Sequence, residues 1–245
     1  MNDLRRWTIV VVFAVAMAWM ESAAVVYLRT LVGAVNPLAT PLPLPQALQW
    51  TEVVREAATL VMLFAVGWLA GATARCRFGY WLIAFGVWDL LYYAFLAAIA
   101  GWPKSLQDWD LLFLIPLPWW GPVAAPMTIA ALMVLCGTLI TGFDSPTRTV
   151  WPSWRVWTLS AAGAGLALFV FMQNGIVGVL GGSFAPQAPP GRFNWPLFVV
   201  ALALMGAPVG AMARNAALIP WSGLPGARRR RLPPPGRPGS SAGAA

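Results

Sequence analysis

Six long apolar segments, joined by short polar or proline-rich connections, occupy most of the chain. Each segment has roughly 20 residues and few charges, which is the length that a helix needs to cross a hydrocarbon core about 30 Å thick. We predict spans at residues 7–28, 51–73, 78–100, 122–141, 156–180 and 195–213. Backbone that faces lipid must be hydrogen-bonded internally, so the pattern predicts an all-α fold, a polytopic membrane bundle of six transmembrane helices.

Composition supports a membrane protein and indicates one domain. Hydrophobic residues make up 59% of the 245 residues and charged residues 10%, against roughly 25% charged in soluble proteins. We assign residues 1–224 to the transmembrane domain. Residues 225–245 are rich in Arg, Pro, Gly and Ser, so we expect a disordered cytoplasmic tail. Its arginine run at residues 228–231 is typical of a topology anchor near anionic lipid, and we expect no nucleic-acid partner.

The arginines are distributed in a way that predicts the orientation. Most of them precede the first span or follow the second, fourth and sixth: Arg5, Arg6, Arg75, Arg77, Arg148, Arg155 and Arg214. The opposite loops hold only Arg29, Lys104 and Arg192, with Arg55 at the start of the second span. The positive-inside rule places this side in the cytoplasm, so both termini should be cytoplasmic. A cleaved secretory signal is an alternative, because Arg5 and Arg6 precede an apolar run that ends in small residues at 22–24. The apolar pattern continues through Tyr27, which favours an uncleaved span.

The absence of histidine and the presence of only two cysteines limit the kinds of catalytic and metal site that the chain can form. Without any histidine, the chain lacks the usual ligand of haem, zinc and copper sites and the usual base of serine hydrolases. Cys76 and Cys136 lie far apart on the predicted topology and have no metal-ligand spacing, so we expect neither a disulfide nor a metal site from them. We expect no cofactor, with an oxygen-only Mg²⁺ or Ca²⁺ site as the alternative.

Acidic residues gather at the end of the predicted bundle opposite the arginines. Six of the eight lie in the outer half of the spans or in the outer loops: Glu21, Glu52, Glu56, Asp89, Asp108 and Asp110. Glu52 and Glu56 are four residues apart and share a helix face, with Arg55 close to the same face. They could form a polar site, or simply a helix start whose acids complement the positive end of the helix dipole.

Asp89 lies near the middle of the third span. An unpaired carboxylate there would cost roughly 2.5–3.5 kcal/mol, so it needs a proton, a partner or water. Tyr92 and Tyr93 follow three and four residues later and can share its helix face. Asp89 is therefore a candidate functional residue. The alternative is a buried pair with Arg29 or Arg55 that only fixes the helix register.

The apolar segment before the fourth span is too long for one helix and contains several prolines. Pro116, Pro118, Pro122 and Pro126 should interrupt it. We predict a short interfacial or re-entrant element at residues 111–115, then a non-helical turn through Trp119 and Trp120. Such a segment could be a lid over the acidic region, or an amphipathic turn on the outer surface.

Several segments in the middle third of the chain resemble a known family. They are REAAT at residues 55–59, FGVWDLLYY at 85–93, GWP at 101–103, WDLLFLIP at 109–116 and PWWGPV at 118–123. They are similar to a family of bacterial multi-pass inner-membrane proteins with no assigned activity. The resemblance implies a bacterial inner-membrane location and brings no reaction or ligand with it.

The polar residues predict an outward-facing pocket for an amphiphilic or lipid-derived ligand. The candidate acid–base residues are Glu21, Glu56 and Asp89, because paired carboxyls in an apolar site can differ in proton affinity. The candidate ligand-binding residues are Arg29, Arg55, Glu52, Tyr92, Tyr93, Asp110 and Trp119, with the arginines holding an anionic head group. The alternative functions are a scaffold subunit of a membrane complex and, third, a small transporter. Membrane lipid is the expected partner. A second copy of the chain or another subunit of a membrane complex is a further candidate partner. The sequence leaves open whether the protein is an enzyme.

Overall fold

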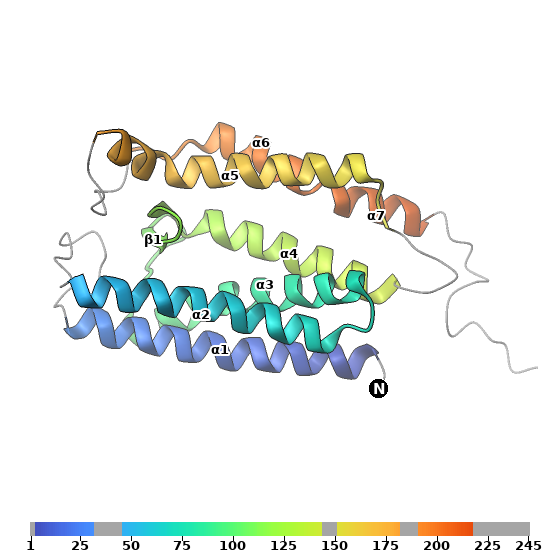
Figure 1. Cartoon of the computed structure of the whole chain (residues 1–245), viewed down its shortest axis with the longest axis horizontal. Coiled ribbons are helices and arrows are strands. Elements are labelled where there is room, and N and C mark those ends of the chain that lie inside the picture. The colour runs from blue at the N-terminus through green and yellow to red at the C-terminus, as the bar shows by residue number, and fades with distance from the viewer. Residues whose placement is uncertain (1–2, 32–45, 144–150, 182–190, 218–245) are drawn as a thin grey trace, which may run out of the picture.

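A computed structural model describes residues 3–31, 46–143, 151–181 and 191–217. Its helices run side by side along one axis (Figure 1). In chain order they are α1 (Asp3–Leu31), α2 (Gln46–Ala70), α3 (Ala74–Ala100), α4 (Ala124–Phe143), α5 (Trp154–Leu180), α6 (Trp195–Met205) and α7 (Ala207–Ala217). The predicted tail at residues 225–245 lies outside the described residues.

Six helical stretches are long and apolar enough to cross a membrane, which confirms the predicted six-helix bundle. They are Leu4–Leu31, Trp50–Ala70, Ala74–Ala100, Ala124–Phe143, Trp154–Val177 and Trp195–Ala216. The sixth stretch contains a break between α6 and α7, which the sequence analysis missed. Pro208 explains it, because proline has no N–H to donate to the carbonyl of Leu204. Helical hydrogen bonding resumes where the N–H of Gly210 donates to the carbonyl of Gly206 at 3.1 Å.

The helix α3 lies at the centre of one group of helices and packs against α1, α2 and α4. Its crossing with α4 is close because glycine allows the two backbones to approach. A Cβ atom on Gly137 would lie only 2.4 Å from the carbonyl oxygen of Gly79. On the other side of the molecule α5 pairs with α6, and both are joined to α4 by a core cluster that includes Ala125, Phe171 and Phe198.

A short β-hairpin replaces the predicted re-entrant element between α3 and α4. Strand β1 (Trp109–Phe113) pairs antiparallel with β2 (Trp119–Pro122), so that Asp110 lies opposite Gly121. The prediction of a proline-broken, non-helical segment is confirmed, but strand pairing was not expected. Pairing satisfies backbone groups that would otherwise be unbonded at this depth. Pro116 and Pro118 fall in the connection between the strands, where their missing N–H groups remove no ladder bond.

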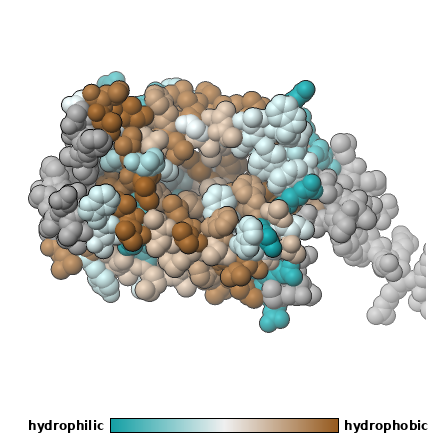
Figure 2. All heavy atoms as spheres, in the orientation of Figure 1, coloured by the Kyte–Doolittle hydropathy of each residue, from teal (hydrophilic) through white to brown (hydrophobic). Residues whose placement is uncertain are grey.

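The two ends of the bundle differ in charge. We call the end that carries the hairpin the hairpin end, and the end at which α1 begins the opposite end. Figure 2 shows a largely hydrophobic body with strongly hydrophilic side chains gathered at the opposite end. The basic residues there are Arg5, Arg6, Arg75, Arg77, Arg155 and Arg214. This asymmetry is the basis for the cytoplasmic placement of the termini, which stays a prediction.

Candidate functional site

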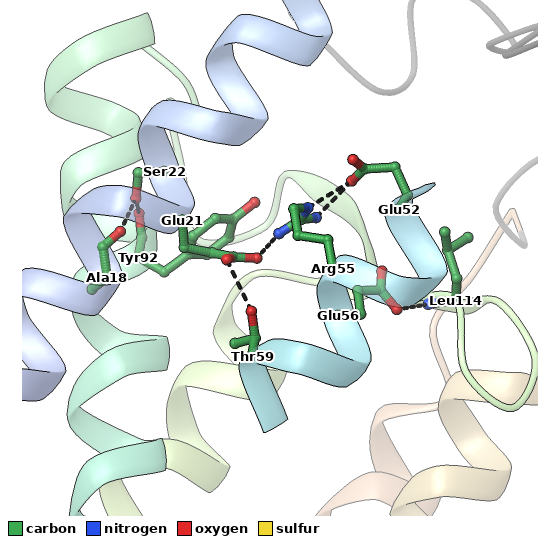
Figure 3. Close-up of polar contacts among 9 residues, drawn as sticks. All are labelled: Ala18, Glu21, Ser22, Glu52, Arg55, Glu56, Thr59, Tyr92 and Leu114. Atoms are coloured by element: carbon green, nitrogen blue, oxygen red, sulfur yellow. Dashed lines mark hydrogen bonds and ion pairs between the residues drawn. The ribbon is translucent and has the colours of Figure 1, made fainter. Parts of the chain in front are cut away.

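Arg55 joins α1 to α2 at the hairpin end. Its Nη1 donates to Glu21 Oε1, and its Nη2 and Nε donate to Glu52 Oε2 at 2.7 and 2.9 Å (Figure 3). The second oxygen of Glu21 accepts a hydrogen bond from the Thr59 hydroxyl at 3.2 Å. Thr59 lies one helical turn after Arg55, so both side chains reach α1 from the same face of α2. The positive charge of Arg55 is therefore already compensated by two carboxylates.

Glu56 holds the hairpin against α2. Its carboxylate accepts the N–H of Leu114 at 2.8 Å (Figure 3). It also accepts a second backbone hydrogen bond, from Ile115. These two residues begin the connection between β1 and β2. A buried carboxylate that accepts two backbone N–H groups is well satisfied, and the geometry therefore favours an anchoring role for Glu56.

A second cluster forms around Asp110, which is 1% exposed. Its Oδ1 accepts a hydrogen bond from Arg29 Nη2 at 2.9 Å, and Tyr93 donates a side-chain hydrogen bond to the same carboxylate. The guanidinium of Arg29 also lies over the ring of Trp102, 4.4 Å from its centroid. Burial raises the pKa of Asp110 above its ordinary value, while the charge of Arg29 and the N–H of Leu111 act in the opposite direction. This cluster connects the end of α1 to the hairpin.

Asp89 has no such partner. It is 8% exposed, and among the described residues no hydrogen bond or ion pair to its carboxyl group is found. The like charge of Asp110 acts on it. The alternative in which Arg29 or Arg55 holds Asp89 is therefore wrong, because both arginines are paired with other acids. Asp89 is therefore a buried polar group that has no hydrogen-bond or ion-pair partner among the described residues of an apolar bundle.

Several buried N–H donors at the hairpin end also lack a partner. Within the part of the chain that the structure describes, these are Arg29 Nη1, Trp88 Nε1, Trp119 Nε1 and Trp120 Nε1. Each such group costs free energy on the order of 1–3 kcal/mol unless it is hydrogen-bonded. Buried polar groups in proteins usually have a hydrogen-bond partner, so a group of N–H donors without acceptors at one end of the bundle needs an explanation.

Aromatic rings connect the acidic region to α5. Tyr92 stacks on Trp88 at 6.2 Å, and Trp88 contacts Phe113 of the hairpin at 6.3 Å. Phe113 contacts Trp119 at 5.2 Å, and Trp119 lies parallel to Phe171 of α5 at 6.3 Å. The predicted ligand residue Trp119 therefore packs between the hairpin and α5, with only its Nε1 left open.

The predicted site residues come together at the hairpin end. They form one cluster around Arg55 and a second around Asp110, while the Asp89 carboxyl has no hydrogen-bond partner among the described residues. Tyr92 lies beside the Asp110 cluster, since its ring contacts that of Tyr93 with the centroids 4.9 Å apart. The backbone of Tyr92 is tied to α1 by the hydroxyl of Ser22, which donates to its carbonyl at 3.0 Å (Figure 3). Sequence reasoning missed Ser22, Thr59 and Trp102, because nothing in their spacing indicates which face of a helix or loop they occupy.

Asp108 lies apart from both clusters and caps its own loop. Its Oδ2 accepts the N–H groups of Lys104 and Ser105 at 2.7 and 3.2 Å, and its Oδ1 accepts the Ser105 hydroxyl at 2.9 Å. Slight burial acts to raise the pKa of Asp108, but these hydrogen bonds and the charge of Lys104 outweigh it and lower the pKa. Asp108 therefore shapes the connection from α3 to β1.

Within residues 3–31, 46–143, 151–181 and 191–217, no three acidic or cysteine side chains are grouped closely enough to hold a metal ion. The carboxylates of Glu21, Glu52, Glu56 and Asp110 instead face arginine or backbone N–H groups.

No protein-family model, no curated protein and no solved structure matches this chain. The resemblance to bacterial inner-membrane proteins stays a prediction.

Proposed function

We propose that this protein binds the polar head group of an amphiphilic, lipid-derived ligand at the hairpin end of its transmembrane bundle. One observation carries the proposal: the Asp89 carboxyl, which is 8% exposed, and the buried Arg29 Nη1 both lack a hydrogen-bond partner among the described residues. Both lie close to the Asp110 cluster, because Arg29 binds Asp110, and because Tyr93, one turn after Asp89 on α3, donates a hydrogen bond to Asp110. A ligand that hydrogen-bonds to them would satisfy groups that no described residue satisfies.

The free-energy cost of buried groups without partners supports a ligand-binding role for these groups over a purely structural one. Natural proteins keep costly, unsatisfied groups mainly where function requires them, because such groups reduce stability. The neighbouring charges show that this chain pairs its buried groups elsewhere: Arg55 has two carboxylates, and Glu56 has two N–H donors. Among the described residues, most of the buried side-chain N–H groups without a partner lie at the hairpin end, and Trp157 Nε1, near the start of α5, is the exception.

The apolar exterior supports an amphiphilic ligand. Large hydrophobic side chains such as Val61, Phe64 and Trp68 of α2 and Phe169 of α5 are exposed on the outside of the bundle. Figure 2 also shows a recess in the surface below α5. A ligand with a hydrocarbon tail can lie along such a surface in the bilayer while its head group meets the polar residues.

We assign the candidate residues different roles. In this proposal the Asp89 carboxyl binds the ligand and exchanges a proton with it, and Arg29 contributes Nη1, which has no partner among the described residues. Glu21, Glu52 and Arg55 hold α1 against α2, while Glu56 anchors the hairpin. Internal pairing of these charges also weakens the case for a scaffold subunit, since no partner helix is needed to neutralise them.

Lipid retention tests the proposal. Protein extracted from its native membrane with a detergent that lacks a sugar head group should retain a specific lipid, visible by native mass spectrometry. The Asp89→Leu variant should lose that lipid. Asp108 is an acid in a partly exposed loop, so the control variant Asp108→Asn should keep the lipid. Equal lipid occupancy in wild type and Asp89→Leu would overturn the proposal.

We also propose a bacterial inner membrane as the location, with both termini in the cytoplasm. The basic opposite end supports this orientation through the positive-inside rule. In a background without Cys76 and Cys136, a single cysteine at exposed Lys104 should react with a membrane-impermeant maleimide added to intact cells whose outer membrane has been made permeable. Labelling only after lysis would reverse the orientation.

A further inference from the structure

The charges at the hairpin end disfavour an anionic head group. Arg55 is already bound by Glu21 and Glu52, and Arg29 by Asp110. Asp89 adds a further acid within the electrostatic influence of Asp110. A phosphate placed here would meet arginines whose charge is already compensated, and it would lie close to carboxyl groups of its own sign.

The open groups require a ligand that both donates and accepts hydrogen bonds. Arg29 Nη1 and Trp88 Nε1 are donors and need acceptors, whereas the ionised form of the Asp89 carboxyl group needs donors. Phosphate oxygens would satisfy only the N–H groups. An ammonium group would satisfy only Asp89. A hydroxyl group does both, because it has one donor hydrogen and two acceptor lone pairs.

The rings beside Asp89 provide an apolar surface for the same ligand. Trp88 precedes Asp89 on α3, and its ring stacks with that of Tyr92 one turn later. Trp88 also contacts Phe113 of the hairpin. Binding sites for small neutral molecules commonly combine such aromatic walls with a few fixed polar groups.

We infer that the head group bound at Asp89, Arg29 and Trp88 is an uncharged polyol, of the kind found in a glycosyl head group. This inference rests on the proposed function and names the chemistry of its ligand. The polyol is either part of a glycolipid or a free sugar, since both present the same hydroxyl groups.

Binding to defined nanodiscs tests the inference. The full chain is placed in phosphatidylcholine nanodiscs that contain glucosyl-diacylglycerol, phosphatidic acid or diacylglycerol, and bound lipid is measured by native mass spectrometry. We expect glucosyl-diacylglycerol to bind at least about tenfold more tightly than the other two, because a polar site discriminates strongly against ligands that leave its groups unpaired. Asp89→Leu should lose that preference, and Asp108→Asn should retain it.

The outcomes separate the two proposals. Preference for phosphatidic acid that depends on Asp89 would overturn the polyol inference and leave lipid binding in place. Lipid binding that is the same in wild type and Asp89→Leu would overturn both, with water as the occupant of the site. Competition by methyl glucoside at equal concentration would identify a free sugar as the source of the polyol, and resistance to it would identify a glycolipid.

Discussion

Replacing Asp89 by leucine should stabilise the ligand-free protein. Asp89 is 8% exposed and has no hydrogen bond or ion pair among the described residues. Leucine has the same number and branching of side-chain heavy atoms and carries no polar atom that needs a partner. The cost of burying an unsatisfied polar group is about 1–3 kcal/mol. The free energy of unfolding should therefore rise by about this amount, and like-charge repulsion with Asp110 would also disappear.

Equilibrium unfolding by SDS in mixed micelles, followed by tryptophan fluorescence, provides the measurement. Asp89→Asn, which keeps a polar group at the site, should gain less than Asp89→Leu. Addition of the ligand should stabilise the wild type and leave Asp89→Leu unchanged, because only a protein that binds a ligand is stabilised by it. A loss of more than about 1 kcal/mol in Asp89→Leu would refute the reasoning, since it would mean that the carboxyl group makes an important internal contact.

Three further changes test other parts of the structure. Asp110→Ala should destabilise the protein by about 3–5 kcal/mol in the same unfolding assay, because it leaves the buried charge of Arg29 unpaired; unchanged stability would mean that the pair does not hold α1 to the hairpin. Gly137→Ala should cost about 1–3 kcal/mol by separating α3 from α4, whereas a Cβ on Gly142 meets no atom within 4 Å, so Gly142→Ala should be neutral or stabilising. The loop capped by Asp108 should be fully protected from hydrogen exchange above pH 3.8, its ordinary pKa, and lose protection as pH falls through its lowered pKa; Asp108→Asn should remove this pH dependence, and a persistent transition would assign it to another group.

The sequence by itself determined the class of the protein and the ends at which its charges lie. The spacing and length of the apolar segments predicted all six spans to within a few residues, because the thickness of a bilayer and the need for internal hydrogen bonds leave few alternatives to helices. The positions of Glu21, Glu56, Asp89 and Asp110 within or beside those spans also placed them at a common depth. Depth along a helix can be read from residue number, so this part of the site was accessible to prediction.

Only the tertiary structure decided which of these groups are paired. Residue number gives depth, but the partner of a side chain depends on how neighbouring helices rotate and on what the loops do between them. Arg29 reaches Asp110 only because β1 carries that carboxylate to the end of α1, and Glu56 meets backbone N–H groups only because a hairpin forms where an irregular turn was predicted. The same packing leaves Asp89 without a partner among the residues that the structure describes, and that is the feature from which the ligand is inferred.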